Sequence, residues 1–288
     1  MPHLLRWALA AGAAAFVYGL YEPFRFRLVS KDVPVDWGGP PLDILHLSDM
    51  HLSPGNARLT EFLRSLPDML ERTPDLVLAT GDLIRGDDAI DPVVDLLASI
   101  EARLGRFYVL GSHDYYVSAG PSYWKYFSKE RRVRSKTRTD VTRLEDGLRA
   151  KGWVPLTNRT ETVEHDGGTI RLSGVDDPYL NRHDTSHIRR TAGDDLAIGL
   201  VHAPNVVTEW ALAGFDLVVA GHTHAGQVRI PLVGAVVTNS DLPAALASGL
   251  HRIGRTWLHV SPGLGTGKYA PIRFLARPEA TVLRLRGA

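Results

Sequence analysis

The sequence contains no cysteine among its 288 residues. This absence excludes disulfide bridges, thiolate zinc sites, iron–sulfur clusters and cysteine nucleophiles. An excess of one charge is also missing, because 33 basic and 32 acidic residues leave a formal net charge of +1. Proteins that coat nucleic acid carry a surplus of positive charge, so this balance argues against that class. Twelve histidines are present, and any metal site must combine them with carboxylate or amide ligands.

The remaining composition is that of a folded globular protein. Hydrophobic residues make up 44% of the chain and charged residues 23%, which excludes disorder along its whole length. The length is sufficient to bury a large core. We expect an N-terminal segment over residues 1–31, a linker rich in proline and glycine, and one domain over residues 42–288.

The N-terminal segment contains an uncharged apolar run, Trp7–Tyr21. Fifteen helical residues rise about 22 Å, which is short of the roughly 30 Å hydrocarbon core, and residues 4–6 extend the run if the arginine snorkels. We predict an N-terminal hydrophobic helix that serves as a single anchor in the cell membrane. A cleaved signal peptide is the main alternative and a buried soluble helix another. Three basic residues after the run and one before it favour a cytoplasmic catalytic domain.

Short apolar runs of strand length recur after the linker, and several are rich in β-branched residues, as buried strands require. They are Leu42–Leu47, Leu76–Ala79, Phe107–Leu110, Leu196–Val201, Leu217–Ala220, Trp257–Val260 and Thr281–Leu285. Helical patterns lie between them, for example over Leu59–Leu70 and Asp91–Arg103. This alternation predicts an α/β fold.

Polar residues follow the ends of five of these runs, where open α/β sheets place their binding crevices. In chain order they are Asp49 and His51, Gly81 and Asp82, Gly111 to Asp114, His202, and Gly221 to His224. We therefore expect five loops to bring carboxylates and imidazoles to one edge of the fold. His46 and His259 lie inside apolar runs and are expected to be core residues instead.

Such a set supplies the oxygen and nitrogen ligands that bind borderline first-row cations. A carboxylate has two oxygens, so one aspartate can bridge two cations about 3.5–4 Å apart. A cation pair neutralises phosphate oxygens, lowers the pKa of a bound water and aligns the nucleophile with the leaving group. The pattern therefore indicates metal-assisted hydrolysis of a phosphoester.

These ordered motifs resemble those of the calcineurin-like metallophosphoesterases over residues 42–286. The resemblance implies an α/β four-layer sandwich, in which two mixed β-sheets are flanked by helices. The strings SDMHLS, GHTHAGQ and SPGLGTG resemble the membrane-tethered bacterial subgroup, whose characterised relatives include UDP-diacylglucosamine pyrophosphohydrolases. For residues 263–268 the subgroup implies a glycine-rich turn near the site.

The resemblance also implies a role for each residue. Two divalent ions are expected, with Mn, Fe and Zn all compatible. Asp49, His51 and His224 would bind one ion, Asp82 would bridge to the second, and His202 and His222 would hold the second. His113 would act as a catalytic residue beside the phosphate, stabilising charge or protonating the leaving oxygen.

One position departs from the family pattern. Ser112 stands where the family has an asparagine whose amide oxygen ligates the second metal. A neutral serine is a shorter and poorer ligand. A water held by Ser112 would fill the gap, or the second ion would bind weakly or be missing.

Other features are candidates for substrate contact. Residues 121–150 form a basic and aromatic insertion that includes Trp124 and Lys125, and it is expected to line one wall of the cleft and to meet a membrane surface. A solvated insertion is the alternative. Gln227 is an expected orienting residue. Asp176 and Asp177 either place a carboxylate near the cleft or cap a turn.

We therefore predict a hydrolase that cleaves a phosphodiester or pyrophosphate bond of a lipid-linked substrate by metal-activated hydroxide. A nucleotide or other soluble substrate is the first alternative. A metal-binding scaffold that has lost turnover through Ser112 is the second. No nucleic acid is expected as a partner, and no protein partner can be inferred.

Overall fold

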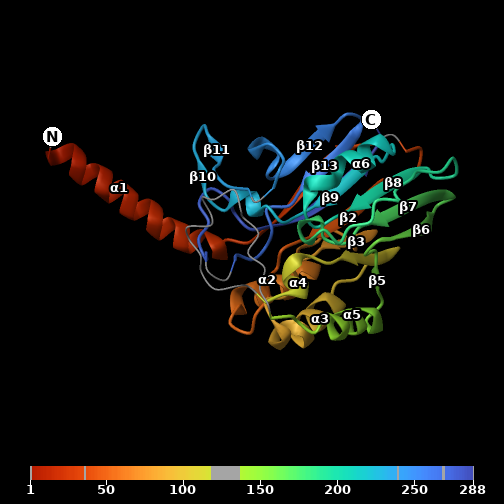
Figure 1. Cartoon of the computed structure of the whole chain (residues 1–288), viewed down its shortest axis with the longest axis horizontal. Helices are drawn as coiled ribbons and strands as arrows, with labels where there is room; N and C mark the ends of the chain where they lie inside the picture. Colours follow the sequence, from red (N-terminus) through yellow and green to blue (C-terminus); the bar gives the residue numbers. More distant parts are fainter. Residues whose placement is uncertain (1, 36, 118–136, 239, 268–269, 288) are drawn as a thin grey trace.

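The computed structural model describes residues 2–35, 37–117, 137–238, 240–267 and 270–287. Two six-stranded β-sheets form the centre of the fold (Figure 1). The first sheet has the order β1 (Arg27–Pro34), β14 (Glu279–Arg286), β2 (Leu42–Leu47), β3 (Leu76–Thr80), β4 (Gly105–Val109) and β5 (Trp153–Pro155). The second has the order β12 (Gly249–Ile253), β13 (Thr256–Val260), β9 (Leu217–Ala220), β8 (Leu196–Leu200), β7 (Gly168–Gly174) and β6 (Arg159–His165). Both sheets contain parallel and antiparallel pairs, so both are mixed.

Side-chain alternation along the strands explains the layers. In β2, Ile44 packs into the core between the sheets, whereas Leu45 and Leu47 pack into a second core on the opposite face. Successive side chains of a strand point to opposite faces, so a fully apolar run serves two cores at once. The helices α2 (Ala57–Met69), α3 (Ile90–Ala98) and α5 (Val141–Ala150) cover this opposite face, and α6 (Val207–Leu212) covers the outer face of the second sheet.

The spacing of the apolar residues explains why the sequence of α2 forms a helix. Its buried residues Leu59, Phe62, Leu63 and Leu66 are spaced three and four apart and form one apolar stripe. The expected two mixed sheets flanked by helices are therefore present. Each of the seven predicted strands is also found, with ends that shift by no more than two residues.

Strand β1 lies where the sequence predicted the end of the N-terminal segment and the linker. It pairs in parallel with β14 over Arg27–Pro34, and Arg27 and Lys31 both form ion pairs with the buried Glu279, at 2.7 and 3.2 Å. Its side chains are mostly half-buried or exposed, so its sequence lacks the apolar run that predicts the other strands. The first sheet therefore begins before residue 42.

The expected membrane-spanning anchor is not supported by the structure. Residues Pro2–Tyr21 form the helix α1, which projects away from the sheets (Figure 1). Within the described part of the chain, no helix is long and apolar enough to cross a membrane.

Candidate metal centre

The predicted ligands lie in loops at one edge of the two sheets. Asp49 and His51 follow β2, and Asp82 follows β3. His202 follows β8, and the pair His222 and His224 follows β9. Five of these six residues have positive φ angles: Asp49 (50°), His51 (43°), Asp82 (51°), His222 (70°) and His224 (49°). Left-handed backbone is unfavourable for non-glycine residues and is concentrated at functional sites, where the surrounding fold enforces it.

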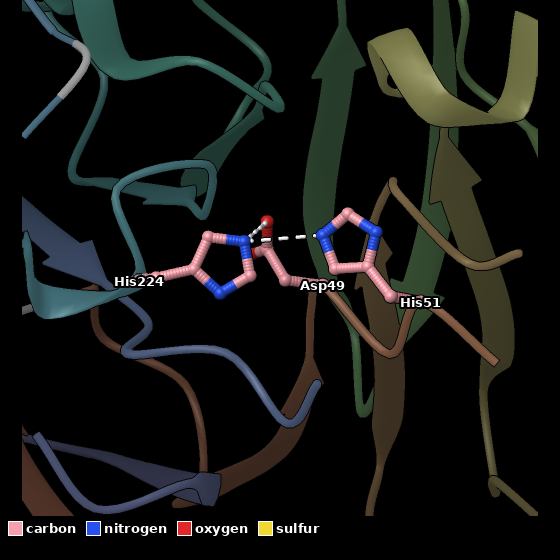
Figure 2. Close-up of side chains that lie close together, drawn as sticks. All are labelled: Asp49, His51 and His224. Atoms are coloured by element: carbon pink, nitrogen blue, oxygen red, sulfur yellow. Dashed lines mark hydrogen bonds and ion pairs between the residues drawn. The ribbon is translucent and has the colours of Figure 1, made fainter. Parts of the chain in front are cut away.

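The first cluster contains Asp49, His51 and His224. The Nε2 atoms of His51 and His224 lie 3.1 Å apart, and His224 Nε2 lies 3.4 Å from Asp49 Oδ1 (Figure 2). One potential ligand atom from each residue falls within 4.8 Å of the others. Nitrogen and oxygen atoms converge at this spacing when they surround a shared cation, so the cluster fits the first predicted metal site.

The second cluster is centred on Asp82 and His202. Asp82 Oδ2 lies 3.3 Å from His202 Nε2 and 3.5 Å from His51 Nε2. His222 joins this cluster through its Nδ1 atom, which lies 3.2 Å from His202 Nε2. A single oxygen of Asp82 therefore faces both clusters, a position that allows the carboxylate to bridge two cations.

Hydrogen bonds outside the clusters orient these side chains. His202 Nδ1 donates to the backbone carbonyl of Thr80 at 2.7 Å, which leaves its Nε2 facing Asp82. The backbone N–H of His222 donates to the Asp49 carboxylate at 3.0 and 3.1 Å. Bonds of this kind fix the ring orientation and the tautomer of a metal-binding histidine.

Burial makes the site electrostatically unfavourable without cations. It raises the pKa of Asp49 to about 6, an effect that His202 opposes. Burial acts in the same direction on Asp82, but His202, His113 and His51 hold the pKa of that carboxyl well below its usual value. The pKa values of His51 and His224 are held well below normal, chiefly by burial. Neutral imidazoles beside buried carboxylates are the state in which such groups bind metals.

His113 lies beside both clusters. Its ring centroid is 4.8 Å from that of His51, and it shares a group of potential ligand atoms with His51 and Asp82. It is half-buried in the short helix α4 (Ser112–Tyr115). Its neighbour Ser112, also half-buried, begins the same helix.

The other residues predicted to contact the substrate are Gln227 and those of the basic and aromatic insertion. The side-chain nitrogen of Gln227 donates to the carbonyls of Ala270 and Ile272, at 2.7 and 3.2 Å, so this amide holds a loop. Trp124 and Lys125 lie outside the described residues, as does most of the insertion. Its described part contains α5, a regular helix that packs against α3.

Residues 263–267 of the glycine-rich segment lie against the site, as expected. Gly263 has a φ angle of 72°, and a Cβ atom there would lie 2.7 Å from Asp49 Cβ. Only glycine accommodates both the left-handed backbone and this close approach. The segment therefore supports Asp49 by backbone packing.

Two residues shape the site without a role predicted from the sequence. Asp114 is fully buried and accepts hydrogen bonds from the backbone N–H groups of Gly111, Leu83 and Ile84, which ties the loops after β3 and β4 together. Arg273 is also fully buried, and its Nη2 lies 3.2 Å from His224 Nδ1. Asp114 belongs to a motif that the sequence displays, but nothing in the sequence around Arg273 indicates burial.

The two alternatives for residues 176 and 177 both hold in part. Asp177 caps the short helix η4 (Pro178–Leu180) by accepting from the Tyr179 N–H at 3.0 Å. It is also fully buried, and burial raises the pKa of its carboxyl to about 7, with His202 and Asp82 acting on it as nearby charges. The Tyr179 ring lies 5.0 Å from that of His222. This capped turn therefore forms part of the wall on the His222 side.

Sequence comparison agrees with this geometry. The profile of the calcineurin-like phosphoesterases matches residues 42–226. The chain belongs to this family. The uncharacterized metallophosphoesterase YkuE of Bacillus subtilis (strain 168) is 28% identical, over 97% of this chain and 94% of its own length. The transmembrane protein with metallophosphoesterase domain of Bos taurus is 30% identical, over 91% of this chain and 57% of its own length.

Solved structures show a more distant likeness. Haemophilus influenzae NAD nucleotidase gives a TM-score of 0.47 at 14% identity, covering 78% of this chain and 46% of its own. The phosphopantetheinyl hydrolase PptH of Mycobacterium tuberculosis gives 0.43 at 12% identity, covering 81% of this chain and 95% of its own.

As a member of the calcineurin-like family, the protein is a metallophosphoesterase, a divalent-metal-dependent hydrolase of phosphoester bonds. The finer resemblance to the membrane-tethered subgroup stays a prediction.

Proposed function

We propose that this metallophosphoesterase uses two divalent cations to hydrolyse a phosphodiester or phosphoanhydride bond. The observation that carries the proposal is the position of Asp82 Oδ2, 3.5 Å from His51 Nε2 and 3.3 Å from His202 Nε2. One carboxylate oxygen between two histidine clusters is the arrangement that two neighbouring cations need. Mn, Fe and Zn are all compatible with such mixed ligands.

Each residue of the site has its own proposed role. Asp49, His51 and His224 would hold one cation, His202 and His222 the other, and Asp82 would bridge them. When bound, the cations neutralise phosphate oxygens and lower the pKa of the attacking water. The imidazole of His113, whose ring centroid lies 4.8 Å from that of His51, would hydrogen-bond a phosphate oxygen at the site and give a proton to the leaving oxygen.

In this proposal, Ser112 lowers the affinity of the second site for its cation. Its hydroxyl is a weaker ligand than an amide oxygen, so the second cation depends on His202, His222 and Asp82. We propose that Ser112 holds a water at that position. The second cation should then bind less tightly than the first.

We further propose a lipid-linked substrate and attachment to the cell membrane. What supports this is apolar surface: Trp7 and Val17 of α1 have 75% and 65% of their surface exposed. The hairpin β10 (Arg229–Ile230) and β11 (Gly234–Ala235), which follows the His224 loop, carries the exposed side chains of Leu232 and Val233 at its turn. Apolar groups left in water at two places fit contact with a lipid surface.

The first experiment uses the full chain, stripped with chelator and reloaded with Mn, Zn or Fe. Hydrolysis of bis(p-nitrophenyl) phosphate should appear only in reloaded protein and be lost in Asp82→Asn. Asp95→Asn is the matched control, since the Asp95 side chain is 74% exposed and lies on α3 away from the loops. Turnover that survives Asp82→Asn would refute the proposed centre. A pyrophosphate-linked lipid compared with a cyclic nucleotide then tests the substrate class.

A further inference from the structure

Two fully buried histidines face each other between the sheets. His46 lies on β2 of the first sheet and His259 on β13 of the second, and neither is exposed to solvent. Their Nδ1 atoms are 2.8 Å apart. The apolar runs that contain them predict two core residues, and their burial confirms that. A polar group in a core nevertheless requires a partner, and these two are connected to the metal centre.

A continuous chain of hydrogen bonds runs from this pair to Asp49. His46 Nε2 lies 2.9 Å from the Thr80 hydroxyl, which donates to the Ser48 hydroxyl at 2.7 Å. The Ser48 hydroxyl donates to Asp49 Oδ2 at 2.6 Å. All of these groups are buried. We call the set His259, His46, Thr80 and Ser48 the histidine–hydroxyl chain.

The carboxylate fixes the direction of every bond in the chain. An ionised carboxylate only accepts, so Ser48 must donate to it, and Ser48 has no second proton to give. Ser48 therefore accepts from Thr80, and Thr80 must in turn accept from the Nε2–H of His46. A neutral His46 with its proton on Nε2 accepts at Nδ1, so that His259 donates from Nδ1. Burial lowers the pKa of His46 to about 3 and that of His259 well below normal, consistent with two neutral rings.

The far end of the chain supports this direction. With its proton on Nδ1, His259 has a bare nitrogen at Nε2. That atom is buried and finds no hydrogen-bond partner among the described residues. Buried backbone N–H groups without a partner are rarer in proteins than buried acceptors without one, so an unprotonated nitrogen is the more common state for such an atom. His259 Nε2 is thus the unprotonated nitrogen, as the direction of the hydrogen bonds toward Asp49 requires.

The near end divides the two oxygens of Asp49 between different tasks. Oδ2 accepts from the Ser48 hydroxyl, and the His222 N–H donates to both oxygens, at 3.0 Å to Oδ2 and 3.1 Å to Oδ1. Oδ1 faces His224 Nε2 at 3.4 Å, inside the first cluster. Because the chain occupies Oδ2, it presents Oδ1 to the cluster.

We propose that His46 and His259 are positioning residues of the metal centre, which act through Thr80 and Ser48 to hold the Asp49 carboxylate in its metal-binding orientation. The inference rests on the proposed metal function. It also assigns a purpose to a polar path that crosses from the second sheet to the first. Groups that orient metal ligands in this way typically contribute 10–100-fold to metal affinity.

The test measures the dissociation constant of Mn²⁺ by titration calorimetry on the chelator-stripped full chain. Thr80→Val removes the hydroxyl at nearly constant shape and should weaken binding about 10–100-fold, whereas Thr80→Ser restores it. His259→Leu should weaken binding as well, and His259→Asn, which keeps a donor near the Nδ1 position, should recover most of it. In a Thr80→Val background, His259→Leu should add little, because the chain is already broken.

One control variant separates positioning from general stability. His165→Leu removes another buried histidine, one that stacks on Trp37 away from the chain, and it should lower the melting temperature without changing Mn²⁺ affinity. Equal Mn²⁺ affinity in wild type, Thr80→Val and His259→Leu would overturn the inference while leaving the proposed function intact. A wild-type chain that neither binds Mn²⁺ nor hydrolyses bis(p-nitrophenyl) phosphate would instead refute the proposed function.

Discussion

The backbone N–H of His113 donates to Asp82 Oδ1 at 2.8 Å. This bond occupies one oxygen of the carboxylate, and the other oxygen faces His51 and His202. The residue that carries the proposed catalytic imidazole therefore also orients the proposed bridging ligand, but it does so with its backbone. The two contributions can be separated by changing the side chain alone.

Replacing His113 with asparagine should lower kcat for bis(p-nitrophenyl) phosphate about 100-fold, the usual scale for loss of a general acid. The N–H bond to Asp82 remains, so the metal content should match that of the wild type. Steady-state kinetics and metal analysis of the same preparation check both statements. A parallel loss of metal would mean that the imidazole is a ligand.

Ser112→Asn should strengthen the second cation site, because an amide oxygen ligates better than a hydroxyl. At limiting Mn²⁺ we expect the wild type to retain fewer ions per chain than the variant. Mass spectrometric metal counts after gel filtration test this. Identical counts and identical turnover would show that the serine costs the site nothing.

Arg273→Lys should destabilise the protein by about 3 kcal/mol. The guanidinium donates to the carbonyls of Pro262, Gly263, Gly265 and Ala276, at 2.7, 3.1, 2.6 and 2.8 Å. The single nitrogen of a lysine cannot reach all four, so buried carbonyls lose their donors. Urea unfolding gives the magnitude. Arg255→Lys, in the turn between β12 and β13, provides the comparison and should change stability by less than about 0.5 kcal/mol.

Acidification should destabilise the metal-free protein through His46. Burial lowers the pKa of this ring from 6.5 to about 3, so the unfolded chain binds a proton between these pH values and the folded protein does not. The contribution of His46 to the free energy of unfolding is fully present above pH 6.5. It falls as the pH drops toward 3, by about 1.4 kcal/mol per pH unit. Buried Asp49, with its raised pKa, acts in the opposite sense.

A comparison of the wild type with His46→Gln separates the effect of His46 titration on stability from that of the acidic residues. Glutamine does not titrate, so the stability of wild type relative to this variant should fall steadily between pH 6 and pH 4. Urea unfolding at half-unit intervals provides the curve. Parallel curves would show that His46 is protonated in the folded state.

Leu232→Ser combined with Val233→Ser tests the proposed lipid contact. Both side chains are exposed at the hairpin turn, so their loss should leave hydrolysis of the soluble diester unchanged. Turnover of a pyrophosphate-linked lipid in vesicles should fall about tenfold or more, given the apolar surface removed. Equal activity on both substrates would argue against contact through the hairpin.

The sequence predicted the strands and the candidate metal ligands for one shared reason. Buried parallel strands need nearly continuous apolar runs, and a polar residue directly after such a run stands out. Asp49 after β2 and His202 after β8 are visible in this way. Strand β1 has no such run because its side chains are largely exposed or half-buried, and pairing with β14 rather than an apolar face defines it.

Features that depend on tertiary structure were beyond prediction. The left-handed backbone of Asp49 and His224 opposes local preference and exists only because neighbouring loops impose it. The burial of Arg273 depends on carbonyls that a folded turn brings together. The hydrogen bond between His46 and His259 joins residues 213 positions apart, a separation at which no spacing rule operates.

The position of β14 has a consequence for how the protein is made. In the first sheet this strand lies between β1 and β2, so residues 279–286 separate two strands that precede residue 48. A ribosome delivers the N-terminal strands first, at about 5–20 residues per second. Strand β2 must therefore wait, with one edge unpaired, until Glu279–Arg286 emerges. Such an edge is a template for pairing with other chains, so the nascent chain exposes a pairing surface in the interval before β14 is synthesised.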